Sequence, residues 1–353
     1  MRILLLINWK IRYCDEVPND LQPSDYCCPQ ETFWFFKYFD KKPQVDVVDI
    51  SAPKCIEKIE NKIRFHFFQT LRILFKLNKY DLIFIHGSNS AMLLCALKRF
   101  FHLKMPPILD VDISSFHQAS YSGIIHRLSQ YSSKAFDFML YHTSSQIDYY
   151  KEEFPWLVDK SKFVLLGVDY EYWKNKTYPD IKEKNSYIVC VGYRKRDWDT
   201  LLEAYDKAKI KEDLYLIGNP NIKSKNSKVK VLPFIPIEEL MTYIVNSKFS
   251  VIPLDDFNYS FAQLTLLQQM ALGVPILAAD VPAIRDYANE SNGVESYVPY
   301  NVDSLKEKLI SMSEKPNDKL IQMGESNIAA VKSTLSEQDM AKKIEMACNN
   351  LLK

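Results

Sequence analysis

Glycine is scarce in this sequence: 8 of its 353 residues are glycines, against 21 tyrosines and 20 phenylalanines. A glycine-rich loop is the usual way in which a protein wraps backbone N–H groups around a phosphate. Because so few glycines are present, we expect any anionic ligand to be held mainly by the N-termini of helices and by cationic side chains.

The sequence also lacks a cysteine framework, a long apolar run and an excess of one charge. Its 7 cysteines are odd in number and lack metal-ligand spacing, which favours reduced thiols in a cytoplasmic protein. No stretch approaches the roughly 20 apolar residues that cross a bilayer, and residues 1–10 are typical of a first core strand, not of a signal peptide. A net charge of +1 argues against nucleic acid as a partner.

Short apolar runs alternate with helical patterns along most of the chain. The first half predicts parallel strands at residues 2–8, 45–50, 82–87, 107–112 and 138–142, with helices at 31–39 and 88–101 and another from residue 144. The second half predicts strands at 187–192, 214–218, 229–234, 251–254 and 274–278, with helices at 201–208, 238–245 and 261–272. The fold class is therefore α/β, with two doubly wound domains.

Residues 170–185 lie between the two series and show no clear periodicity, so we expect the domains to meet there. The first domain is predicted to cover residues 1–169 and the second residues 170–335. The amphipathic tail, residues 336–353, predicts a last helix.

The most informative stretch is residues 251–284, which predicts a strand, a loop, a helix, a turn and a further strand. Ser260 is the predicted N-cap of this helix, and Gly273 is its predicted left-handed C-terminal residue. The N-terminus of such a helix follows the carboxyl end of a strand, where open α/β sheets bind anionic ligands. The same pattern also fits a buried strand–helix–strand unit without a ligand.

The run QQMALGVP at residues 268–275 resembles the donor-site signature of GT-B glycosyltransferases of the large family 4 type, the glycosyl transferases group 1. The Gly-Val-Asp run at residues 167–169, followed by Trp173, is similar to the family's domain junction. The resemblance implies two Rossmann-like domains facing a central cleft, a nucleotide sugar held by the second domain, and a last helix that packs on the first.

In that family two glutamates, eight residues apart, flank the helix, one near the donor sugar and one at the ribose. Ser260 and Gln268 stand at these two positions. Gln268 can bond ribose hydroxyls, because its amide both donates and accepts, whereas Ser260 is too short to replace a glutamate.

Three cations, Arg194, Lys195 and Arg196, follow the predicted strand at 187–192. This loop resembles the family segment in which an arginine and a lysine clamp the diphosphate, with Arg194 at the arginine position and Arg196 at the lysine position. Cations there would stabilise the departing diphosphate without a metal, so no metal cofactor is expected. The alternative is a solvated basic turn.

Two further residues are predicted to lie at the donor site. Phe234 ends the predicted strand at 229–234, where the family contacts the base, and it either stacks on a base or belongs to the core. Gln263 lies in the first turn of the helix that begins after Ser260, near the expected phosphate position.

In the first domain, Asp110 and Asp112 end the predicted strand at 107–112, and His117 lies in the loop that follows. Asp112 and His117 are the catalytic candidates, because the family often has a His-Asp or similar pair here. Asp112 would take the proton of the acceptor hydroxyl as a general base. Alternatively it positions groups while a donor phosphate acts as the base, or it caps the next helix.

Residues 58–80 carry six Lys or Arg and one Glu among apolar residues. This pattern predicts a basic amphipathic helix that lies on an anionic membrane surface. The alternative is a core helix with a basic outer face.

Together these features predict an enzyme that transfers a sugar from a UDP- or GDP-linked donor to a glycan or lipid-linked glycan acceptor, in cell-surface polysaccharide or glycoconjugate synthesis. We expect it in the cytoplasm or on the cytoplasmic face of the membrane. The alternative is a glycosyltransferase-like subunit that only binds a partner, which the loss of both glutamates favours. An epimerase of the same fold would need paired carboxylates around the sugar, and the sequence offers no such pair.

Overall fold

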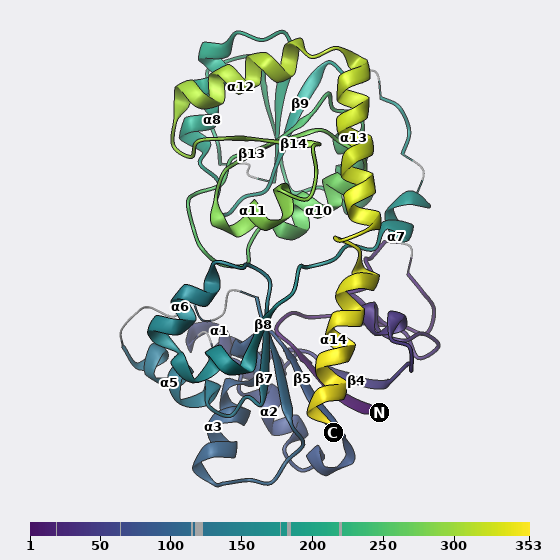
Figure 1. Cartoon of the computed structure of the whole chain (residues 1–353), viewed down its shortest axis with the longest axis vertical. Coiled ribbons are helices and arrows are strands. Elements are labelled where there is room, and N and C mark those ends of the chain that lie inside the picture. The colour runs from purple at the N-terminus through teal and green to yellow at the C-terminus, as the bar shows by residue number, and fades with distance from the viewer. Residues whose placement is uncertain are drawn as a thin grey trace. The chain divides into compact units, whose positions relative to one another are not determined.

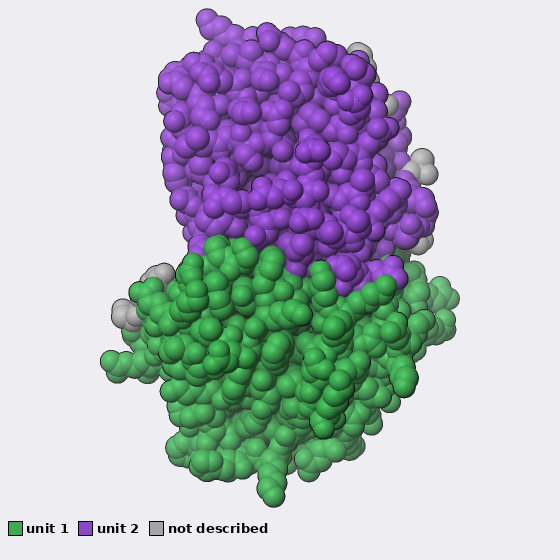
Figure 2. Space-filling model, in the orientation of Figure 1, with its two compact units in different colours: residues 1–164, 340–353 green, residues 165–339 purple. Residues whose placement is uncertain are grey.

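The computed structural model describes the chain except for residues 19, 64, 114–115, 117–122, 177, 182–184 and 219–220. The chain forms two compact units, which Figures 1 and 2 show: unit 1 comprises residues 1–164 and 340–353, and unit 2 comprises residues 165–339. The boundary expected from the sequence, between residues 169 and 170, lies five residues further along the chain than this division. None of the helices described is both long and apolar enough to cross a membrane.

Unit 1 is built on a six-stranded parallel sheet with the strand order β4-β1-β5-β6-β7-β8. Its strands are β1 (Arg2–Ile7), β4 (Gln44–Val48), β5 (Leu82–His86), β6 (Ile108–Asp112), β7 (Phe138–Tyr141) and β8 (Ser161–Phe163). Every residue of β5 and β6 is buried, as expected of parallel strands covered on both faces. The helices are α1 (Lys54–Ile63), α2 (Phe68–Ile73), α3 (Met92–Phe100), α5 (Ile124–Ser133) and α6 (Gln146–Glu153), with short 3-10 helices at Trp34–Tyr38, Leu77–Lys79, Ser88–Ala91 and Pro155–Lys160.

The last helix, α14 (Glu337–Leu351), contributes its residues from 340 onward to unit 1. The carboxylate of Glu345 accepts hydrogen bonds from the backbone N–H of Asp40 at 2.9 Å and of Lys41 at 3.5 Å. These bonds attach the C-terminal residues to the segment before β4. A further small sheet pairs β2 (Arg12–Tyr13) with β3 (Tyr26–Cys27).

The single helix predicted for residues 58–80 is wrong, because the chain divides there into α1, α2 and a 3-10 helix. At the start of α2, the buried carboxylate of Glu60 accepts a hydrogen bond from the N–H of Phe68, at 2.7 Å, which satisfies one of the free N–H groups of that helix end. The helix predicted for residues 31–39 is likewise shorter than expected, a 3-10 helix at Trp34–Tyr38.

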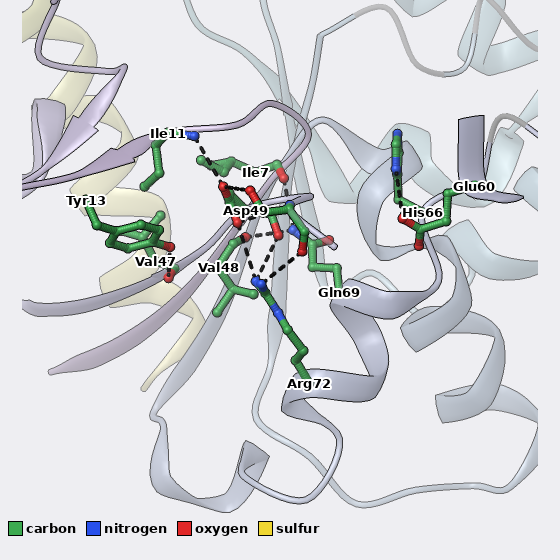
Figure 3. Close-up of polar contacts among 11 residues, drawn as sticks. Ile7, Ile11, Tyr13, Val47, Val48, Asp49, Glu60, His66, Gln69 and Arg72 are labelled. Carbon is green, nitrogen blue, oxygen red and sulfur yellow. Dashed lines mark hydrogen bonds and ion pairs between the residues drawn. The ribbon is translucent and has the colours of Figure 1, made fainter. Parts of the chain in front are cut away.

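In Figure 3 the side chains of Gln69 and Arg72, both from α2, point toward the carboxyl ends of β1 and β4. The amide of Gln69 donates to the carbonyls of Ile7, at 2.9 Å, and Val48, at 2.7 Å. The guanidinium of Arg72 donates to the carbonyls of Ser51 and Asp49, both at 3.0 Å. Part of the polar pattern in residues 58–80 therefore serves to bind α2 to the ends of β1 and β4.

Unit 2 is built on a second six-stranded parallel sheet, with the order β11-β10-β9-β12-β13-β14. Its strands are β9 (Tyr187–Val191), β10 (Asp213–Ile217), β11 (Val229–Leu232), β12 (Ser250–Ile252), β13 (Ile276–Ala279) and β14 (Val294–Tyr297). Its helices are α7 (Tyr170–Lys174), α8 (Trp198–Ala208), α9 (Ile237–Val245), α10 (Gln263–Ala271), α11 (Pro282–Ala288), α12 (Val302–Glu314) and α13 (Asn317–Lys332). In Figure 1, α8 lies beside α12, and α10 lies beside α13.

The strand order of unit 2 reverses between β9 and β12. From β9 the chain proceeds outward through β10 and β11 and then returns to the other side of β9. Ligands of open α/β sheets bind at the carboxyl ends of the strands beside such a switch point. The topology therefore predicts that a ligand would bind near the loops after β9 and β12 and near the start of α10.

Candidate functional site

A pocket of about 230 Å³ lies at this switch point of unit 2. Its wall is largely apolar and comes from the ends of β9 and β10, the segment after β11, and helices α9 and α10. Gly192 and Gly218 stand at the ends of β9 and β10 with φ angles of 128° and 101°, a conformation that favours glycine. Three polar residues of the lining, Thr265, Gln268 and Gln269, come from α10.

Arg196 holds the loop after β9 and does not project from it. Its guanidinium donates to the carbonyl of Val191 through Nε, at 3.2 Å, and Nη2, at 3.0 Å, and to the carbonyl of Arg194 through Nη1, at 3.1 Å. The residue is 7% exposed, and burial lowers the pKa of its guanidinium. A Cβ atom on Gly192 would lie 2.6 Å from Nη2 of Arg196 and would displace the guanidinium, and the φ of 128° at this position independently favours glycine.

The other two cations of the loop are exposed. The guanidinium carbon of Arg194 lies 5.2 Å from the ring centroid of Tyr193, within cation–π distance. Lys195 has a φ of 54° and turns the chain between Arg194 and the buried Arg196. Of the three predicted diphosphate ligands, Arg194 and Lys195 are therefore open to a ligand, and Arg196 supports them.

The prediction that Ser260 caps α10 is wrong. The N-cap is Ala262, which has a φ of 68° and whose side chain cannot cap. Ser260 instead donates from Oγ to Oε1 of Gln263 at 2.6 Å, and Nε2 of Gln263 donates to the carbonyl of Ala283 at 2.9 Å. Both side chains are thus bonded to protein groups. The predicted left-handed residue after the helix is confirmed, since Gly273 has a φ of 70°.

Phe234 is 81% exposed, so the core alternative for this residue is wrong. Its ring lies edge-to-face with that of Tyr193, with 6.5 Å between centroids, and both residues line the pocket. Two aromatic rings are therefore available to a flat ligand at this place.

Sequence reasoning missed Gln269, which is 0% exposed and lines the pocket beside Gln268. Neither atom of its amide has a hydrogen-bond partner among the described residues. The sequence did contain a sign of this residue's role, since a second glutamine directly follows Gln268 where the helix is otherwise apolar.

Asp112 ends β6 of unit 1 and is 0% exposed. Its Oδ2 accepts hydrogen bonds from the hydroxyl of Tyr150 at 2.6 Å and from Nε2 of Gln146 at 3.2 Å. Burial and the charge of Asp112 raise the pKa of Tyr150 well above its usual value. Asp112 is the centre of a buried polar network, and its role as a base remains a prediction. The other catalytic candidate, His117, lies outside the described residues.

His86, at the end of β5, is also buried. Burial, with a smaller effect of His142, lowers the pKa of His86 to about 3, so its imidazole is neutral at physiological pH. The rings of Trp9 and Trp34 lie edge-on to it, with centroids at 5.3 Å and 4.9 Å. The structure thus assigns His86 to an aromatic cluster. In the ranges that the structure describes, no three His, Cys, Asp or Glu side chains form a group that could hold a metal ion.

The pocket lies in the part of the chain that matches a known family. Residues 185–315 match the family described as glycosyl transferases group 1. No curated protein gives a significant match to the sequence.

Solved structures resemble the whole chain. Sucrose-phosphate synthase from Thermosynechococcus elongatus matches with a TM-score of 0.68 and 12% identity, covering 99% of each chain. Anabaena HepE in complex with UDP and glucose matches with a TM-score of 0.69 and 13% identity, covering 99% of this chain and 100% of HepE. A UDP-forming trehalose-phosphate synthase from Burkholderia xenovorans matches with a TM-score of 0.65 and 11% identity, covering 100% of this chain and 99% of the synthase. At these identities the likeness shows a shared GT-B fold.

Proposed function

We propose that this chain is a glycosyltransferase that transfers a sugar from a UDP- or GDP-linked donor to a glycan or lipid-linked glycan. Its fold is GT-B, and its residues 185–315 match the family described as glycosyl transferases group 1. The observation that carries this proposal is the pocket at the switch point of unit 2, inside the matched residues, with two exposed cations in its flanking loop. A nucleotide needs this combination of an apolar pocket and nearby positive charge.

The donor is proposed to place its base in the pocket and its diphosphate near Arg194 and Lys195. Negative charge increases on the diphosphate as the glycosidic bond breaks, and positioned cations stabilise that charge in the transition state. UDP is the first candidate, because Anabaena HepE has been solved with UDP and with UDP-glucose. Gln268 of α10 lines the pocket, and its amide can bond the ribose hydroxyls of such a donor.

We further propose that turnover needs no metal, since two cations can neutralise the diphosphate. The test is turnover in excess EDTA. Activity equal to that in Mg²⁺ supports the proposal, and activity that returns only when Mg²⁺ or Mn²⁺ is added back contradicts it.

The acceptor is proposed to be presented at an anionic membrane surface, in the synthesis of a cell-surface polysaccharide or glycoconjugate. Ile59, Leu71 and Phe75 of unit 1 are exposed, Phe75 to 94%, and four exposed lysines, at 58, 62, 76 and 79, lie in the same segment. Exposed apolar and basic side chains together favour anionic lipid. The triple variant Lys58→Glu, Lys62→Glu, Lys76→Glu should lose sedimentation with phosphatidylserine vesicles. Undiminished binding would remove the segment from the proposal.

A second candidate is a glycosyltransferase-like subunit that binds a partner without turnover. Ser260 and Gln268 favour it, because they replace the two carboxylates of the family, and Ser260 is bonded to Gln263. Such a subunit would retain the fold and bind no donor productively.

The first experiment is a thermal-shift screen of the full chain against UDP, GDP, ADP, CMP and their common sugars. A ligand that binds the native state raises the melting temperature by mass action. Release of free nucleotide from the shifting donor, followed in the presence of candidate acceptors, then tests transfer. A shift together with release supports the enzyme, a shift without release on any acceptor favours the subunit, and no shift with any nucleotide contradicts the donor site.

A further inference from the structure

Gln269 is a buried amide that no described residue satisfies. It belongs to α10, is 0% exposed, and has no hydrogen-bond partner at Nε2 or Oε1 among the residues that the structure describes. Buried amides in folded proteins are nearly always paired, because an unpaired donor and acceptor retain the full cost of leaving water. Its position offers an explanation, since Gln269 lines the pocket of unit 2.

A comparison within α10 shows that the helix can satisfy a buried amide from the protein alone. Gln263, also buried, donates from Nε2 to the carbonyl of Ala283 and accepts at Oε1 from Ser260. Gln269 has no such arrangement. It shares a helical face with Thr265, four residues earlier, and that face borders the pocket.

The rest of the pocket indicates what kind of ligand would satisfy this amide. Ile217, Leu240, Met241 and Ile244 make the wall apolar, and the rings of Tyr193 and Phe234 border it. Its volume of about 230 Å³ is below the roughly 300–1,000 Å³ of sites for drug-sized ligands. These features suit one flat ring system with apolar faces and a polar edge.

We propose that Gln269 hydrogen-bonds the edge of the donor's nucleobase and so determines which base the protein accepts; this inference rests on the proposed function. A nucleobase has two π faces and an edge on which an N–H or NH₂ donor adjoins an oxygen or nitrogen acceptor. The glutamine amide can donate from Nε2 and accept at Oε1 at the same time. Glutamine pairs with base edges in this bidentate way in nucleic-acid grooves.

The experiment compares the wild-type chain with Gln269→Met, which has similar volume and no amide. Titration calorimetry measures the affinity for UDP, GDP, ADP and CDP, and for ribose 5-phosphate, which has no base. We expect the affinity for the preferred nucleotide to fall by about 5- to 150-fold, the range of one bidentate base contact, and the preference among bases to diminish. The affinity for ribose 5-phosphate should not change.

The melting temperature of the ligand-free protein supplies a second readout. Gln269→Met removes an unsatisfied amide and should melt at the same temperature as the wild type or higher, whereas Gln263→Met breaks two formed hydrogen bonds and should melt lower. If Gln269→Met melts well below the wild type, Gln269→Leu, which is also apolar and nearly as large, replaces it in the titrations.

Two outcomes would overturn the inference, and they differ in what they say of the proposed function. If the wild type binds a nucleotide and Gln269→Met binds it with the same affinity and the same base preference, the base contact is refuted and the donor site stands. If the wild type binds no nucleotide at all, the donor site itself is refuted, and the base contact with it.

Discussion

At the scale of single residues, burial decides what a side chain does in this protein. Arg194 and Arg196 belong to one loop, yet Arg194 is exposed and Arg196 makes three hydrogen bonds to backbone carbonyls. Gln263 and Gln269 belong to one helix, and only the amide of Gln263 is paired within the described residues. Residues of the same type therefore have different roles in this protein, and substitutions at each position can distinguish these roles.

The two exposed cations and the buried one should respond differently to alanine. The double variant Arg194→Ala, Lys195→Ala should weaken nucleoside diphosphate binding by about 10- to 100-fold, since hydrogen bonds to charged groups contribute about 1.5–3 kcal/mol, with little change in melting temperature. Arg196→Ala removes the three hydrogen bonds that the guanidinium donates to the carbonyls of Val191 and Arg194, and should lower the melting temperature by several degrees.

Calorimetry and thermal melts of both variants check this pair of expectations. Full affinity in the double variant would contradict the diphosphate assignment. An unchanged melting temperature in Arg196→Ala would contradict the structural role of its guanidinium.

Asp112→Asn tests the catalytic candidate that the structure describes. If the carboxylate is the general base, this near-isosteric change should lower kcat by about 10²- to 10⁴-fold and leave the KM for the donor unchanged. Steady-state kinetics measure both constants. A fully active variant would refute the role, and Asp112 would then serve only the buried network with Tyr150 and Gln146.

At the scale of elements, close packing of α10 against α13 depends on a pair of glycines. Gly273 follows α10 with a φ of 70°, and Gly324 lies in α13. A Cβ atom on Gly324 would lie 2.1 Å from the carbonyl oxygen of Gly273, which no side-chain movement could relieve. Since α10 carries the polar face of the pocket, this crossing positions the candidate site.

Gly324→Ala should therefore destabilise the protein, although alanine is the better helix former by about 1 kcal/mol. The steric overlap is expected to exceed that gain and to cost about 1–3 kcal/mol net. Thermal melts measure the effect, with Glu325→Ala, an exposed neighbour in the same helix, as the control. A Gly324→Ala variant as stable as the control would show that the two helices can separate at no cost.

At the scale of the whole molecule, a buried ion pair makes the folding stability of unit 2 depend on pH. Nζ of Lys248 donates to Glu212 at 2.7 Å, and the hydroxyl of Ser313 donates to the same carboxylate at 2.5 Å. Burial would raise the pKa of Glu212, but these hydrogen bonds outweigh it and hold the pKa below its usual value. The carboxylate therefore stabilises unit 2 above the unfolded pKa of about 4.3, and this stabilisation is lost as the pH falls through the lower folded pKa.

Glu212→Gln should reveal this contribution. At pH 7 the variant leaves Lys248 without its charge partner and should lose about 3–5 kcal/mol, the usual cost of breaking a buried pair. The difference in stability between wild type and variant should shrink as the pH falls below about 4. Denaturant unfolding between pH 3 and pH 7 measures it. A difference that is independent of pH would contradict the pairing.

The strands and the two-unit organisation were predictable, because they follow from local composition. Continuous apolar runs at residues 82–87 and 107–112 predicted β5 and β6 to within one residue, since parallel strands covered on both faces need such runs. The turn after α10 was equally predictable, because Gly273 is suited to a positive φ. The family likeness of residues 268–275 located the candidate donor site within the region that the family model matches.

The other features of the fold and of the candidate site depend on contacts between residues that lie far apart in the sequence. No local sequence pattern reveals such contacts. Glu60 accepts a hydrogen bond from the first N–H of a helix that begins eight residues later, within the stretch where a single helix was expected at residues 58–80. Arg196 turns back onto the carbonyl of Val191, and Gln269 lines a pocket whose other walls come from β9, β10, the segment after β11 and α9. The sequence by itself determined which segments are strands and helices and which family signature they carry. Only the tertiary structure decided which charges are exposed and which buried amide lines the pocket, because burial depends on all the elements that pack around a side chain.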